Sequence, residues 1–231
     1  MDFLGWVTQN KETLKILFGF IITLICIFIV IRTNRLFKIS KHKGIRYFRN
    51  AFFFYGIAFF IKYVVESITF ILKSSSLSLL IISSLFEFFL IMAGFFLLYS
   101  LLWKKLESRN EKYASSLLNP KISVFYLMTI IIVVLDLINL SHFYLFLSQI
   151  TVFALASLIS FVNYFNNPDK KFLKFYFAAM VLSFITWILN AFSAFYFGWD
   201  QGIMINIYVI NTIIFLLFLY GVVKFTSLPK R

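Results

Sequence analysis

Histidine and cysteine are scarce in this sequence of 231 residues, and each shortage excludes a kind of site or bond. Two histidines, His42 and His142, are too few for the seven-helix zinc hydrolases, which need several histidines with carboxylate support. The single cysteine, Cys26, excludes an intramolecular disulfide. The sequence contains neither a G-x-S-x-G nucleophile motif nor a glycine-rich phosphate loop. We therefore expect a protein that is not an enzyme and that holds no metal or other cofactor.

Charged side chains are also few, at 13% of residues against 61% apolar ones. This composition leaves too little polar surface to cover a water-soluble globule, so the chain belongs in a membrane. Roughly 20 apolar residues cross a hydrocarbon core of about 30 Å. The sequence thus predicts an all-α, multi-pass protein of the cell membrane, with one seven-helix transmembrane domain over residues 1–231. The predicted spans are 14–32, 47–72, 78–103, 121–140, 142–165, 172–197 and 202–224.

Acidic residues are fewer than basic ones, 9 against 22, and the net charge is +13. This excess does not indicate nucleic acid, because 18 of the 22 lysines and arginines lie in or beside the first, third and fifth loops or after the last span. By the positive-inside rule that side is the cytoplasm, which predicts an outside N-terminus and an inside C-terminus. The first loop, residues 32–49, carries seven of these residues. They fit an ordinary orientation signal in contact with anionic lipid, or a docking surface for an acidic cytoplasmic protein.

Six of the seven predicted spans place their most polar side chain at a similar depth, in the outer half. The candidate ligand-binding residues are Lys62, Glu66, Glu87, Asp136, Gln149, Trp187, Asn190 and Asn211. Charged groups in hydrocarbon cost about 2.5–3.5 kcal/mol each, so they normally face the bundle interior or a wet cavity. One lysine against three carboxylates leaves two excess negative charges. Either a cation binds there or some carboxyls are protonated.

Three of these residues have simpler interpretations. Lys62 and Glu66 lie one helical turn apart and can neutralise each other. Lys62 could also extend its ammonium group to the membrane surface along its apolar stem. Asp136 lies near the end of its span and could be solvated.

Two architectural resemblances follow from the predicted topology. An outside N-terminus with seven spans resembles the heptahelical receptors and rhodopsins over the whole chain. A retinal protein is expected to carry its Schiff-base lysine in the middle of the seventh span, whereas "GIMINIYVINTIIFLLFLYGVVKF" has only Lys224, at its inner end. Residues 46–63 also match 174–191 in residue class, with Lys62 opposite Asn190. This candidate three-plus-one-plus-three repeat is similar to the seven-helix sugar carriers, although their proline-glutamine hinge is missing.

Two functions fit these observations. The first is a sensor or binding module with an outward-facing polar pocket for a small ligand that is cationic or forms hydrogen bonds. The second is a small secondary transporter, which could be proton-coupled because buried carboxylates are common in proton relays. The sparsely polar inner halves of the spans favour sensing.

Overall fold

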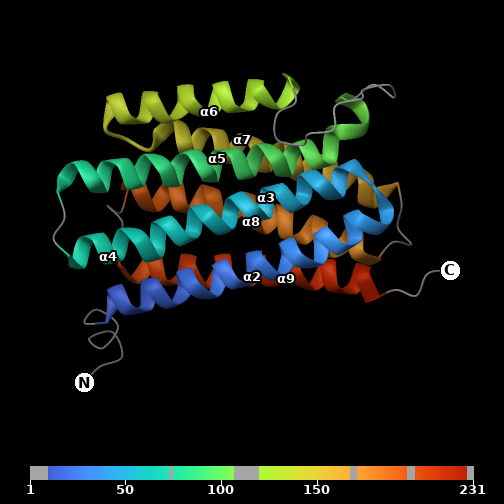
Figure 1. Ribbon diagram of the computed structural model, residues 1–231, viewed down its shortest axis with the longest axis horizontal. Coiled ribbons are helices and arrows are strands. Elements are labelled where there is room, and N and C mark those ends of the chain that lie inside the picture. Colours follow the sequence, from blue (N-terminus) through green and yellow to red (C-terminus); the bar gives the residue numbers. More distant parts are fainter. Residues whose placement is uncertain (1–9, 73–74, 107–119, 167–170, 197–200, 228–231) are drawn as a thin grey trace.

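The computed structural model describes residues 10–72, 75–106, 120–166, 171–196 and 201–227. Within these residues, seven helical segments are long and apolar enough to cross a membrane (Figure 1). The elements are α2 (Lys11–Ser40), α3 (Lys43–Phe59) continued by the π-helical turn η1 (Phe60–Val65) and α4 (Glu66–Ile71), α5 (Ser76–Leu106), α6 (Pro120–Asn139), α7 (Phe143–Phe165), α8 (Lys171–Tyr196) and α9 (Gln201–Ser227). The prediction of an all-α chain with seven such helices is confirmed.

The first helix is longer than predicted, because it continues to Ser40 instead of ending at residue 32. The sequence from 33 to 40 contains neither glycine nor proline, and its arginine, leucine and lysine are good helix formers. The helix ends at Lys41, whose φ of 53° is left-handed and whose N–H donates to the Phe37 carbonyl at 2.8 Å. The predicted first loop of residues 32–49 is therefore mostly helical, and only Lys41 and His42 separate α2 from α3.

The outward faces of all seven helices are apolar. Large side chains on these faces are exposed, for example Phe28 of α2, Leu127 of α6 and Leu158 of α7, with 56%, 61% and 63% of their surface accessible. Apolar surface this extensive needs an apolar solvent. The exposed faces and the length of the helices together indicate a membrane protein.

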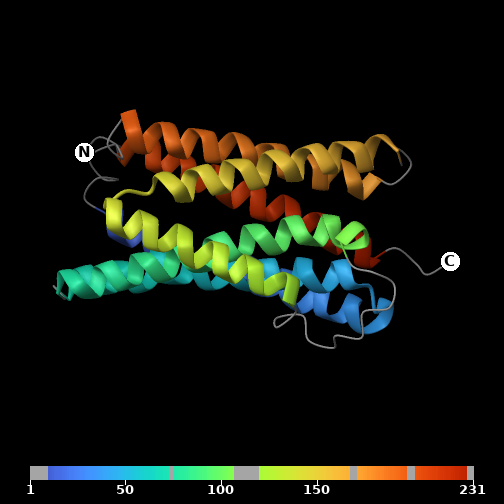
Figure 2. The ribbon, with the colours of Figure 1, turned by 90° about the horizontal axis from the view of Figure 1, so that it is seen from above.

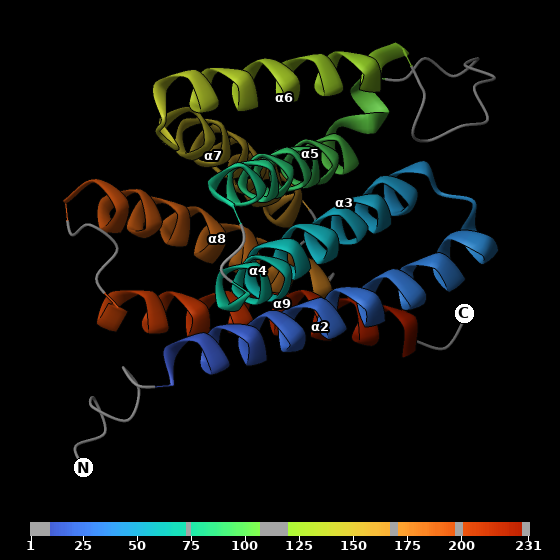
Figure 3. The ribbon, with the colours of Figure 1, turned by 60° about the vertical axis from the view of Figure 1, so that its left-hand side comes forward.

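Six of the helices form a closed ring. Each packs against the next in the order α2, α3, α5, α7, α8 and α9, and α9 packs against α2. The remaining helix, α6, packs against α5 and α7 on the periphery (Figure 3). Figure 2 shows α7 and α8 on one side of the molecule and α2 and α3 on the other. The interior of the ring is therefore the only region bordered by all six helices.

Aromatic side chains fill the middle of the ring. Phe52 of α3 packs against Phe215 and Phe218 of α9, with ring centroids 5.8 and 5.1 Å apart. Phe48, one turn earlier in α3, contacts Phe218 and Tyr176 of α8. These rings separate two ends of the bundle, which we call outer and inner after the predicted topology.

A π-helical turn interrupts the second membrane-length helix at its outer end. The N–H of Glu66 bonds to the carbonyl of Ile61, five residues earlier, whereas an α-helix would bond four residues back. Gly19 of α2 lies directly against this turn, since a Cβ atom on Gly19 would collide with the Cβ of Tyr63. The absence of a side chain at Gly19 therefore allows α2 to approach η1 closely.

Candidate functional site

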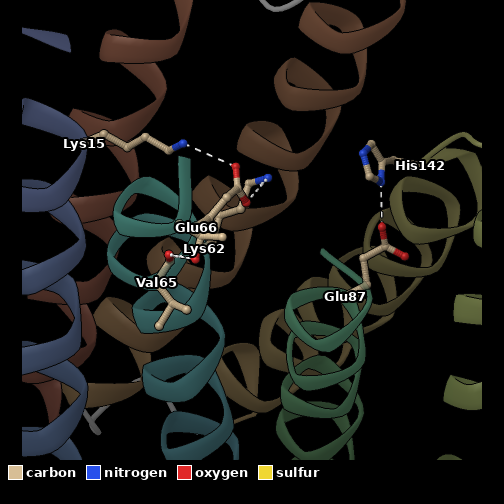
Figure 4. Close-up of polar contacts among 7 residues, drawn as sticks. Lys15, Lys62, Val65, Glu66, Glu87 and His142 are labelled. Atoms are coloured by element: carbon tan, nitrogen blue, oxygen red, sulfur yellow. Dashed lines mark hydrogen bonds and ion pairs between the residues drawn. The ribbon is translucent and has the colours of Figure 1, made fainter. Parts of the chain in front are cut away.

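Lys62 and Glu66, the charged pair within the second span, form an ion pair at the π-helical turn. Lys62 Nζ lies 2.8 Å from Glu66 Oε2. A second cation approaches from α2, where Lys15 Nζ donates to Glu66 Oε1 at 3.3 Å (Figure 4). The three side chains are only 20–30% exposed. One carboxylate thus holds two ammonium groups from neighbouring helices.

A second polar pair lies across the ring. His142, the residue that precedes α7, places Nδ1 2.6 Å from Glu87 Oε1 of α5 (Figure 4). The Glu87 side chain is nearly buried, at 6% exposed, whereas that of His142 is 42% exposed. Nothing in the sequence paired His142 with Glu87. The pair links a buried carboxylate to a histidine that water can reach.

Asp136 forms hydrogen bonds with the backbone instead of another side chain. Its Oδ1 accepts the N–H of Tyr144 at 2.9 Å, and its Oδ2 accepts the N–H of Leu145 at 2.7 Å. Both amides belong to the first turn of α7, where N–H groups have no partner within the helix. Asp136 therefore caps α7, and its negative charge is stabilised by the helix dipole.

Four of the eight predicted residues line one cavity in the outer half of the ring. This outer cavity has a volume of about 120 Å³ and is bordered by Lys62, Trp187, Asn190 and Asn211, together with His142. Its other walls are mainly aromatic and aliphatic. An adjoining outer groove of about 360 Å³ contains Lys15, Lys62 and Glu66. Lys62 lines both hollows and so connects them.

The remaining predicted residues lie beside these hollows. Glu87 reaches the cavity through His142. Gln149 is fully buried in α7 and lies against Gly94 of α5. Within the described residues neither its amide oxygen nor its amide nitrogen has a hydrogen-bond partner. The structure thus brings together residues from six ring helices, while Asp136 and Gln149 lie outside the cavity lining.

The charge balance at the site differs from the one read from the sequence. Lys15 supplies a second ammonium group, His142 faces Glu87, and Asp136 is satisfied by backbone amides. With Lys15 counted, the excess of two negative charges inferred from the sequence falls to one. Among the described residues no three His, Cys, Asp or Glu side chains gather as metal ligands.

A larger inner cavity of about 510 Å³ occupies the other half of the ring. It is bordered by Phe48 and Phe218 at its deep end and by Ser40, His42 and Gly44 near the α2–α3 junction. Phe218 lines the outer cavity as well. The two cavities are therefore separated by the layer of aromatic rings in the middle of the ring.

Comparison with known proteins identifies one relative that extends over most of the chain. It is an uncharacterized protein of Archaeoglobus fulgidus, 27% identical over 221 residues, which are 90% of each chain. No family model and no solved structure matches the sequence. The similarity covers nearly the full length of both chains, and the seven apolar helices are compatible with a membrane sensor or a transporter.

Proposed function

We propose that this chain is a multi-pass protein of the cell membrane that binds a small ligand at its outer end, with the N-terminus outside and the C-terminus inside. The observation that carries the proposal is the position of Lys62. It lies in a π-helical turn, a feature that is frequent at functional sites, and it lines both the outer cavity and the outer groove. A charged residue held between two hollows is available to a ligand in either.

The chemistry of the walls suits a ligand with hydrogen-bonding or cationic groups and an apolar body. Asn190 and Asn211 each offer an amide donor and acceptor to the outer cavity. Trp187 and the neighbouring aromatic rings offer apolar surface and favourable contact with a cation. A cationic group could also take the place of Lys15 beside Glu66, since that contact is the longer of the two ion pairs.

If the protein is a sensor, the basic residues 32–49 at the inner end would be the part that contacts its partner. Arg49 is held by hydrogen bonds from its guanidinium to Asn34 and Asn50, which joins α2 to α3 at that end. Movement of α2 on ligand binding at Lys15 would therefore reach this basic segment. We propose that it contacts anionic lipid and an acidic cytoplasmic protein.

Transport is the second candidate, and the two cavities favour it. They lie on opposite sides of one aromatic layer and share Phe218, so a shift of that layer could expose the same path to either end. The order of the ring also fits a repeat of α2, α3 and α5 by α7, α8 and α9, because each neighbour contact in one triple has a counterpart in the other. Lys62 and Asn190, matched in that repeat, line the same cavity.

A ligand panel tests binding first. The purified protein in lipid nanodiscs is heated with small amines, amino acids and sugars. A compound that binds the folded protein raises its melting temperature, and the effect grows with the ratio of ligand concentration to Kd. A ligand of the outer site should stabilise the wild type but not Lys62→Met. Equal stabilisation of both proteins by every compound that acts would refute the site. Flux of that ligand into proteoliposomes then separates transport from sensing.

Glu87→Gln tests the role of the buried carboxylate. The change keeps size and hydrogen bonding but removes the charge, so the protein should fold while the pair with His142 is weakened. We expect affinity for the ligand to fall about ten-fold or more. Asp136→Asn is the matched control, because it alters another outer carboxylate that caps α7 without lining the cavity. Unchanged affinity in Glu87→Gln would remove Glu87 from the site.

A further inference from the structure

The inner cavity contains a glycine that helix packing does not explain. Gly221 of α9 lines this cavity, and a Cβ atom added there would meet no atom within 4 Å. The other glycines with described surroundings, Gly19, Gly44, Gly56 and Gly94, each lie against another side chain. Glycine costs about 1 kcal/mol relative to alanine inside a helix. The missing side chain at Gly221 keeps the cavity open.

A buried hydroxyl group on another helix of the lining also has no partner among the described residues. Ser160 of α7 is 2% exposed and lines the cavity, and its Oγ forms no hydrogen bond with the described residues. Other hydroxyls on the lining are satisfied locally, since Thr33 bonds to the Ile29 carbonyl and Ser100 to the Leu97 carbonyl. An unpaired hydroxyl inside a cavity is a position at which a ligand can accept or donate a hydrogen bond.

At the inner end of the bundle, the charged side chains that the structure describes are positive. Among the described residues, the acidic ones (Glu12, Glu66, Glu87 and Asp136) belong to the outer half of the bundle, whereas residues 32–49 supply seven lysines and arginines at the inner end. His42 lies on the cavity lining itself. A hollow with low-dielectric walls focuses the potential of such a cluster. The inner cavity therefore favours a negatively charged group.

We propose that the inner cavity is a second binding site, which takes a small apolar molecule bearing one carboxylate. A volume of about 510 Å³ falls within the range of roughly 300–1,000 Å³ typical of small-molecule sites. The apolar body lies among Leu36, Ile45, Leu101 and Leu217, and the carboxylate points toward His42 and the basic inner end. Ser160 forms a hydrogen bond with the ligand. This site is separate from the outer one.

The test uses octanoate with a bromine on the carbon next to the carboxylate, because bromine quenches the fluorescence of a nearby tryptophan and this end of the ligand lies toward His42. Trp103 is the reporter, since its ring contacts His42 at a centroid distance of 4.8 Å. The other three tryptophans are replaced by phenylalanine. In nanodiscs the probe should quench Trp103 in a saturable manner, and unbrominated octanoate should reverse the effect. The corresponding bromo-alcohol should bind about ten-fold more weakly, because it lacks the charge.

Gly221→Phe places its Cβ atom in open space and directs a ring into the cavity, so it should lose saturable quenching. Leu216→Phe places the same ring on the exposed face of α9 and should behave as the parent protein. Ser160→Ala, which leaves no partner unpaired, should weaken octanoate roughly three-fold. Lys62→Met should bind octanoate normally, so failure of the outer site is distinguishable from failure of this one. Equal quenching in Gly221→Phe and its parent, or equal affinity for acid and alcohol, would overturn the proposal.

Discussion

At the scale of single residues, Glu66 has two cationic partners, one from its own helix and one from a neighbouring helix. Lys62 belongs to the same helix, whereas Lys15 comes from α2, 51 positions earlier in the chain. Loss of either lysine leaves the carboxylate one partner. Loss of the carboxylate leaves two ammonium groups facing each other in a partly buried region, which is the more costly arrangement.

We therefore expect Glu66→Gln to lower the free energy of unfolding by about 1–2 kcal/mol, and Lys62→Met or Lys15→Met to lower it by less than about 1 kcal/mol. The double variant Lys62→Met with Glu66→Gln should be more stable than additivity predicts, because it removes one of the uncompensated charges. Thermal melts of the four proteins in nanodiscs measure this coupling. Additive effects would mean that the ion pairs seen here do not contribute to stability.

The residues that the sequence could identify are those whose own type or depth is unusual. Lys62, Asn190 and Asn211 are polar groups within apolar spans, and they line one cavity as expected from their depth. Lys15 and His142 lie near the ends of their helices, where charged and polar residues are ordinary, so nothing in the sequence marked them. Their partners are 51 and 55 positions away, and only the packing of the helices brings them together.

At the scale of secondary structure, the outer site depends on how closely α2 approaches the π-helical turn. The sequence predicted a span over 47–72, and the structure has a continuous helical segment from Lys43 to Ile71. The π-helical turn within it was not predicted, because residues 51–65 are apolar at nearly every position except Lys62 and so leave no periodic pattern in which an irregular turn would be visible. The close contact between Gly19 and Tyr63 lies at this turn and was not predicted either.

Gly19→Ala should therefore destabilise the protein by about 1–3 kcal/mol, because the added methyl group collides with Tyr63 and displaces α2 from η1. Gly221→Ala is the matched control, since the same methyl group there enters open space and should leave stability unchanged or raise it by up to about 1 kcal/mol. The free energies of unfolding of the two variants, measured in nanodiscs, test this prediction. Equal effects at both positions would contradict the close approach at Gly19.

At the scale of the whole molecule, orientation follows from the distribution of positive charge rather than from the arrangement of the helices. A cysteine introduced between residues 104 and 120, in a Cys26→Ser background, should not react with a membrane-impermeant maleimide in intact cells. A cysteine at residue 141, next to His142, should react. Labelling of the first position and protection of the second would reverse the assignment of outer and inner ends.

The closed ring has a consequence for the order in which the protein is made. Its last contact to form joins α9 to α2, so the helix synthesised last of these seven completes the circle. Until then the nascent bundle has two free lateral edges, and Asn211 is missing from the outer cavity. A ribosome stalled before α9 would thus leave an open arc of helices in the bilayer, which quality-control proteases could distinguish from the finished ring. The lining of the outer cavity is complete only after synthesis has reached α9.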